Sequence, residues 1–176
     1  MLSLLLHPSL PVPRYRVVAE AVRLSHARLQ LRYRLDEDVA AVRLPAPAAI
    51  GRGSRLWQHT CFEAFVGIAG DTSYQEFNFS PSAAWDAYSF ASYRDGAPMG
   101  TDTPPPEIQV RGDTTALTVE TCISINLDRH AVWRVALSAV IEHTDGRLTY
   151  WALHHPPGQP DFHHPSAFVL QLDPPS

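Results

Sequence analysis

The sequence contains no lysine: all 14 of its basic residues are arginine, against 18 acidic residues, and the formal net charge is −4. The arginines form no basic run, and an acidic chain without one has little attraction for a phosphate backbone. We therefore expect no nucleic-acid partner. No apolar stretch approaches the roughly 20 residues of a membrane-spanning helix, and the apolar residues 1–8 lack the basic flank of a signal peptide. The simplest expectation is a cytoplasmic protein with no membrane partner.

Cysteine is also scarce. The chain has two, Cys61 and Cys122, and both lie in segments with a strand-like pattern, which is typical of buried free thiols. A disulfide between them is not predicted. The sequence also lacks a Gly-x-Ser-x-Gly elbow, a phosphate-binding glycine loop and a dinucleotide-binding fingerprint, so no standard catalytic template applies.

What the sequence does contain is alternation of apolar and polar residues. Residues 27–35 place Leu29, Leu31, Tyr33 and Leu35 on one face and polar side chains on the other. A period of two is typical of a half-buried strand. The same pattern recurs in the segments 115–125 and 133–141, and strands are also expected at 17–24, 39–44, 148–153 and 167–172. Asp145-Gly146 predicts a tight turn that makes a hairpin of 133–141 and 148–153.

The 16 prolines gather between these runs and mark loops and strand ends. The best helix candidate, residues 82–93, fits the helical period poorly, and we predict a strand there. At 176 residues the chain is long enough for one domain with a core of its own. We predict an all-β fold, an antiparallel β-sandwich of the jelly-roll kind, as a single domain over residues 1–176.

Polar side chains of an unusual kind lie at the centre of the chain. In residues 61–68, Glu63 faces away from the apolar side, and in residues 74–80, Glu76 and Asn78 do the same. If these segments are neighbouring antiparallel strands, the three side chains and Tyr74 line one surface, close in sequence to Trp57, Trp85 and Tyr88. Carboxylates and amides beside flat aromatic rings suit a sugar, which has both hydroxyls and an apolar C–H face. The alternative is a plain solvent-facing sheet surface, with the tryptophans in the core.

A family resemblance covers the chain from Leu56 to its end. The central part of the chain resembles the DOMON-like domains, which are related to the family 9 carbohydrate-binding modules, in residues 56–65, 74–82, Trp85, 88–90 and 93–94. The closing segment of the same group is similar to residues 150–156 and 160–164. The resemblance implies a jelly-roll sandwich whose relatives bind sugars or, in some members, haem, and often carry a structural calcium.

Two features of the resemblance bear on the ligand. Sugar-binding relatives hold a ligand between two tryptophans, and Trp57, Trp85 and Trp151 are candidates here. Haem-binding relatives use methionine with lysine or histidine as axial ligands. Because this chain has no lysine and one internal methionine, Met99, haem is not expected unless Met99 pairs with a histidine.

A histidine-rich segment near the C-terminus is the second candidate site. His154, His155, Asp161, His163 and His164 fall within eleven positions, and imidazole with carboxylate is a suitable ligand set for zinc or another transition metal. The spacing matches no standard zinc motif, and the alternative is a loop whose polar side chains bond its own backbone. The predicted metal ligands are His154, Asp161 and His163. A metal-dependent enzyme would need three ligands and an open coordination position.

We therefore predict a non-catalytic domain that binds a small molecule of the carbohydrate type. A soluble sugar, a nucleotide-sugar or a cell-wall precursor fits a cytoplasmic protein better than a polysaccharide does. The predicted ligand-binding residues are Trp57, Glu63, Glu76, Asn78, Trp85, Tyr88, Arg94 and Trp151. The cofactors that the sequence leaves open are a calcium or a transition-metal ion. Two alternatives remain at this point: a metal-dependent enzyme built on the histidine-rich segment, and a protein–protein interaction module. The sequence does not predict the oligomeric state.

Overall fold

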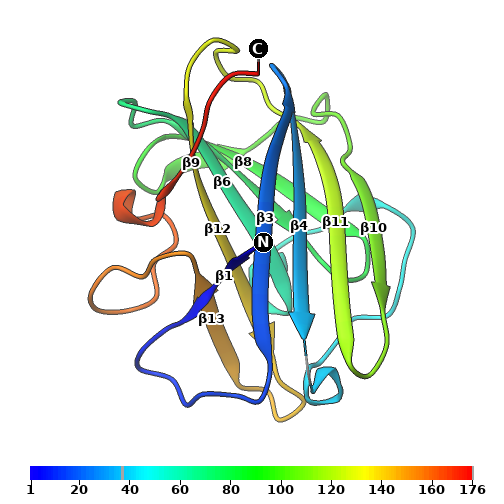
Figure 1. The fold of residues 1–176 in the computed structure, drawn as a ribbon. Helices are drawn as coiled ribbons and strands as arrows, with labels where there is room; N and C mark the ends of the chain where they lie inside the picture. Colours follow the sequence, from blue (N-terminus) through cyan, green and yellow to red (C-terminus); the bar gives the residue numbers. More distant parts are fainter. Residues whose placement is uncertain (37, 176) are drawn as a thin grey trace.

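The structure is a computed structural model that describes residues 1–36 and 38–175. Two sheets pack face to face as a β-sandwich (Figure 1). The smaller sheet has the order β1-β3-β4-β11-β10, with strands at Leu2–Ser3 (β1), Arg16–Ser25 (β3), Arg28–Asp36 (β4), Ala116–Ser124 (β11) and Glu107–Gly112 (β10). Its pairs are all antiparallel. The predicted all-β antiparallel sandwich is confirmed.

The larger sheet carries the pocket described below. Its path is β2-β13-β12-β6-β7-β8-β5, with β14 beside β12 and β9 beside β8. The strands are Leu5–Leu6 (β2), Leu148–Ala152 (β13), Trp133–Glu142 (β12), Cys61–Ile68 (β6), Tyr74–Phe79 (β7), Ala84–Ser92 (β8), Gly51–Arg52 (β5), Leu170–Leu172 (β14) and Asp95–Pro98 (β9). The short β5 pairs with β8 in parallel, and the other pairs are antiparallel.

The main core lies between the sheets and follows from the alternation in the sequence. In β4, Leu29, Leu31, Tyr33 and Leu35 are fully buried, because every second side chain of a strand points to the same face. The Tyr33 hydroxyl donates a hydrogen bond of 2.7 Å to the backbone carbonyl of Glu63 in β6. This buried bond ties the two sheets together directly beneath the candidate site.

The central strands of the larger sheet are buried on both faces, unlike those of the smaller one. Every residue of β7 is buried, and so is all of β6 except Ile68. The C-terminal segment explains this, because Ala167 and Phe168 pack on Phe65 and Tyr74 on the side of the sheet that faces away from the core. This second, smaller apolar cluster holds the segment after β13 against the outer face of the larger sheet.

Most of the predicted strands are present. The hairpin of β12 and β13 is confirmed, with Gly146 in a left-handed conformation (φ 86°) in its turn. The strand predicted within 82–93 is present as β8, Ala84–Ser92. The strand predicted at 39–44 is wrong: Val39–Ala41 is a 3-10 helix, and only Val42 forms a bridge, to His143. Val39 and Val42 are the buried residues of this segment, and a spacing of three suits a helical turn rather than a strand.

Two other expectations are met in part. The strand predicted at 167–172 is shorter, because Pro165–Ala167 forms a 3-10 helix and only Leu170–Leu172 pairs with β12. Both cysteines are free, as predicted, but Cys61 alone is buried. Cys122 faces away from the core, where the guanidinium of Arg28 lies 3.0 Å from its sulfur. Among the described residues, no helix is long and apolar enough to cross a membrane.

Candidate functional site

Two glutamates from neighbouring strands form the floor of the candidate site. In the antiparallel register of β6 and β7, Glu63 pairs with Asn78 and Phe65 pairs with Glu76. These side chains share the face of the larger sheet that points away from the core, so the predicted common polar surface is confirmed. It is not a solvent-facing surface, however. Glu63 and Glu76 are only 3% and 6% exposed, and Asn78 is fully buried.

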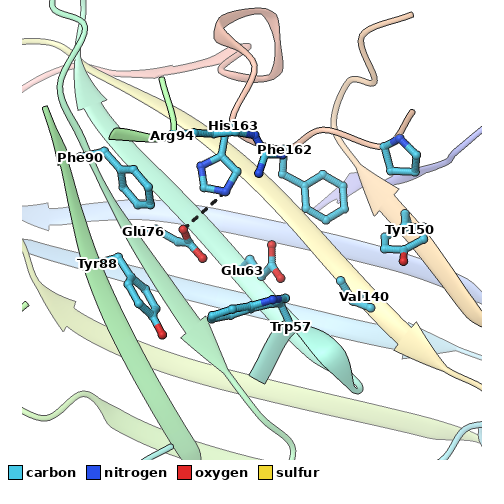
Figure 2. Close-up of a pocket in the computed structure, with 11 residues that line it drawn as sticks. Trp57, Glu63, Glu76, Tyr88, Phe90, Arg94, Val140, Tyr150, Phe162 and His163 are labelled. Atoms are coloured by element: carbon cyan, nitrogen blue, oxygen red, sulfur yellow. Dashed lines mark ion pairs between the residues drawn. The ribbon is translucent and has the colours of Figure 1, made fainter. Parts of the chain in front are cut away.

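A cavity of about 360 Å³ opens above these glutamates. This volume lies at the lower end of the range of roughly 300–1,000 Å³ for small-molecule sites. The cavity is lined by Trp57, Glu63, Glu76, Tyr88, Phe90, Arg94, Val140, Tyr150, Pro160, Phe162 and His163. Figure 2 shows the two carboxyl groups between the ring of Trp57 on one side and His163 and Phe162 on the other. The site therefore combines an acidic floor with aromatic walls.

The wall next to β8 consists of Trp57 and Tyr88. Trp57 lies in the 3-10 helix Leu56–Gln58, and its ring meets that of Tyr88 edge to face, with centroids 5.7 Å apart. Tyr88 is fixed in turn, because its hydroxyl donates a hydrogen bond of 2.6 Å to Asp86. Trp57 is 39% exposed, although tryptophan is normally well buried. An exposed, positioned indole at the edge of a cavity is available to a ligand.

The opposite rim comes from the loop after β13. His163 lies against Phe65 and Phe90, with ring centroids 5.1 Å and 5.0 Å away. The Tyr74 hydroxyl lies 2.9 Å from Nδ1 of His163 and also accepts a hydrogen bond from the backbone N–H of Arg94. Tyr74 can therefore give its own proton to Nδ1, which places the ring hydrogen on Nε2, 3.8 Å from Oε2 of Glu76.

An ion pair holds the end of this rim. Arg94, which follows β8, binds the carboxylate of Asp161 at 2.8 Å, and the Tyr93 hydroxyl donates to the same carboxylate at 2.6 Å. Burial alone would raise the pKa of Asp161, but the hydrogen bonds from Tyr93 and Arg94 hold it below its usual value. Asp161 is therefore ionised at neutral pH, and it compensates the charge of Arg94.

The electrostatics of the floor are unusual for an exposed cavity. Burial raises the pKa of Glu63 well above its usual value, and the neighbouring Glu76 raises it further. Burial likewise raises the pKa of Glu76 to about 7, against the opposing effects of the Asn78 hydrogen bond and Arg94. Burial and the positive charge of Arg94 lower the pKa of His163 to about 4. At neutral pH the floor therefore holds a Glu76 near its midpoint and a neutral His163, beside a Glu63 whose pKa is raised in the same direction.

The structure brings together six of the residues predicted from the sequence. Trp57, Glu63, Glu76, Tyr88, Arg94 and His163 all line the cavity. Asn78 lies behind the floor and donates a hydrogen bond of 2.7 Å to Oε1 of Glu76. It can position this carboxyl group without bordering the cavity itself.

The two other predicted tryptophans point into the core and lie outside the lining of this cavity. Trp85 is 4% exposed and pairs with Phe79 across β7 and β8, on the face that packs against the smaller sheet. Trp151 is 5% exposed and packs 5.5 Å from Tyr15. Trp57 is thus the one tryptophan among the cavity-lining residues, and no pair of tryptophans faces across this cavity.

The three predicted metal ligands do not come together. His154 is exposed, Asp161 binds Arg94, and His163 contacts Tyr74. Over residues 1–36 and 38–175, no group of three or more histidine, cysteine, aspartate or glutamate side chains is arranged to hold a metal ion. The segment instead forms the rim of the cavity through His163.

Sequence reasoning missed Phe90, Val140, Tyr150, Pro160 and Phe162 as lining residues. Phe90 follows Tyr88 by two positions in β8, so the period of a strand could have placed it on the same face. Val140 and Tyr150 are paired across β12 and β13, and the predicted hairpin alone did not fix that register. Phe162 lies in a loop, where no periodicity indicates the direction of a side chain.

No family model and no curated protein matches the chain in sequence. Solved structures do resemble it. A protein from Bacteroides uniformis, with a provisional description as carbohydrate-binding, superposes with a TM-score of 0.63 at 16% identity, over 88% of this chain and 76% of the other. A family 9 carbohydrate-binding module from Caldicellulosiruptor kristjanssonii superposes with a TM-score of 0.54 at 9% identity. That module was solved with glucose and with cellotriose, and the match covers 84% of this chain and 71% or 70% of the module. At these identities the likeness shows a shared β-sandwich fold.

Proposed function

We propose that this chain is a non-catalytic carbohydrate-binding domain, DOMON-like and related to the family 9 modules, and that its ligand occupies the cavity above Glu63 and Glu76. The observation that carries the proposal is the pair of buried carboxyl groups beneath aromatic walls, with the exposed Trp57 at the cavity edge. The sandwich fold shared with two proteins described as carbohydrate-binding supports it.

The chemistry of the cavity suits a sugar ring. A pyranose has an apolar C–H face that packs on an aromatic ring, and Trp57 offers its ring at the cavity edge. Its hydroxyl groups both donate and accept hydrogen bonds, which matches a carboxyl floor that is partly protonated and partly ionised. Nε2 of His163 and the guanidinium of Arg94 supply further donors at the rim. Because Tyr88 and Arg94 are already held by Asp86 and Asp161, binding orders few new side chains.

The first test is isothermal titration calorimetry against a panel of monosaccharides and short oligosaccharides. We expect binding of at least one sugar, and we expect Trp57→Ala to weaken it by about 10- to 30-fold, the typical cost of truncating a tryptophan anchor. Leu24→Ala is the matched control, because Leu24 is 51% exposed but lies on the smaller sheet. A panel without any binding, or binding that Trp57→Ala leaves unchanged, would contradict the proposed site.

A further inference from the structure

The floor of the cavity contains a carboxyl group with only one of its two oxygens hydrogen-bonded by the described residues. Glu63 is 3% exposed, and Ser138 donates a hydrogen bond of 3.2 Å to its Oε2. The other oxygen, Oε1, has no hydrogen-bond partner among residues 1–36 and 38–175. Figure 2 shows the carboxyl group of Glu63 pointing into the cavity beside that of Glu76. Oε1 is therefore accessible from the cavity, where it can accept a hydrogen bond from a ligand.

The two arginines near the floor are paired with carboxylates other than Glu63 and Glu76. Arg94 binds Asp161 at 2.8 Å, and Arg52 binds Asp86 at 2.7 Å. The nearest basic group to Glu76 is His163, at 3.8 Å, and this imidazole is neutral. Among the described residues, neither floor glutamate has an arginine within ion-pair distance. When these carboxyl groups ionise, no arginine of the described residues lies within ion-pair distance of them, and Arg94 acts on Glu76 only from farther away.

The walls around this floor are aromatic. The rings of Trp57, Tyr88, Phe90, Tyr150 and Phe162 border the same cavity. The face of an aromatic ring is electron-rich and attracts an ammonium group within about 6 Å of its centre. Carboxylates below and aromatic faces around are the two elements that favour a ligand with a positive charge over a neutral one of the same shape.

We propose that the preferred ligand is an amino sugar, whose protonated amino group lies against the carboxyl groups of Glu63 and Glu76 while its ring packs on Trp57. This inference rests on the proposed function, and it adds the charge of the ligand. A neutral sugar brings no charge that favours ionised carboxyl groups, whereas an ammonium group donates up to three hydrogen bonds to the two carboxylates that it stabilises.

Binding of an amino sugar should also release protons from the two floor glutamates. Burial holds the pKa values of both glutamates above their usual range in the empty site. A bound ammonium ion favours the ionised carboxylates, so binding lowers these pKa values and releases protons. An N-acetylated or neutral sugar carries no charge and releases none by this route. At pH 6.5 we expect release of about one proton per bound amino sugar.

The test is calorimetry at pH 6.5 with glucosamine, N-acetylglucosamine, glucose and tetramethylammonium, each in two buffers of different ionisation enthalpy. We expect glucosamine to bind at least about 10-fold more tightly than N-acetylglucosamine and glucose. We also expect the enthalpy of glucosamine binding to depend on the buffer, unlike that of N-acetylglucosamine or glucose, because the two neutral sugars release no protons.

Two variants locate the effect. Glu63→Gln and Glu76→Gln keep the size of the side chain and remove the charge, and either should lower the affinity for glucosamine by about 10-fold or more while changing that for glucose less. Glu107→Gln is the matched control, because Glu107 is exposed on β10 of the smaller sheet. If one of the glutamine variants fails to fold, the other still tests the proposal.

The outcomes separate the inference from the proposed function. Glucose or N-acetylglucosamine binding as tightly as glucosamine would overturn the amino-sugar inference and leave the carbohydrate-binding function in place. Tetramethylammonium binding in the absence of any sugar binding would overturn both, because the site would then recognise a cation without a sugar ring. Absence of all binding would also overturn both. Preference for glucosamine with proton release, lost in Glu63→Gln or Glu76→Gln, would support the inference.

Discussion

Glu76→Gln is expected to stabilise the protein relative to the wild type by about 3 kcal/mol more at pH 8 than at pH 4. In the folded state burial raises the pKa of Glu76 from the usual 4.5 to about 7. Its contribution to the free energy of unfolding is therefore fully present below pH 4.5 and is lost as the pH rises to about 7. Glutamine cannot ionise, and it keeps the acceptor that Asn78 needs, so the variant avoids this loss.

The wild-type protein alone would conceal this effect, because His163 acts in the opposite direction. The pKa of His163 is lowered to about 4 from 6.5, so its contribution to stability is present above pH 6.5 and is lost as the pH falls to about 4. The two losses cover nearly the same pH range and oppose each other. The measurement is therefore urea denaturation of wild type and Glu76→Gln in parallel from pH 4 to pH 8. A constant difference between the two curves would contradict the raised pKa of Glu76.

Phe65→Ala is expected to destabilise the protein by about 3–5 kcal/mol, the usual cost of truncating a buried phenylalanine. Phe65 is 1% exposed and lies in the small cluster on the outer face of the larger sheet. It packs against His163 and Phe168, which hold the loop that forms the rim of the cavity. We therefore expect the affinity for the ligand to fall by about 10-fold as well, because the rim loses its support.

Phe79→Ala separates these two effects. Phe79 is fully buried in the neighbouring strand, but its ring points into the core between the sheets. The variant should lose a similar free energy of unfolding, measured by urea denaturation, and keep its affinity for the ligand at temperatures where both variants remain folded. If Phe79→Ala weakened binding as much as Phe65→Ala, the loss of affinity would reflect general destabilisation, and the specific role of the outer cluster would be wrong.

The strands could be predicted from the sequence because alternation of side chains is a local property. Residues 28–36 and 116–124 carry the pattern without interruption, and the structure has β4 and β11 there. The segment 39–44 failed for a related reason: a run this short has too few residues to distinguish a period of two from a spacing of three. The larger sheet was harder to predict, because its burial on both faces depends on the distant Phe168.

In the site, too, the sequence could place residues that follow local strand alternation but not those placed by tertiary packing. Glu63 and Glu76 could be placed on one face because they alternate with apolar neighbours in strands that also proved adjacent. Trp85 and Trp151 could not be assigned to core or cavity, since an aromatic residue in a strand suits either. The loop with Phe162 and His163 reaches the cavity through tertiary packing alone. Because the sequence does not show this packing, its clustered histidines suggested a metal site, whereas in the structure His163 lines the cavity.

The most direct test of a sugar site in this cavity is a nitrogen–proton correlation spectrum of the four tryptophan side chains during titration with the bound sugar. Trp57 is 39% exposed at the cavity, whereas Trp85, Trp133 and Trp151 are 4%, 0% and 5% exposed. The indole signal that disappears in Trp57→Phe identifies Trp57. We predict that this signal shifts on titration and that the three buried indoles shift little. A shift of a buried indole with Trp57 unaffected would contradict the account.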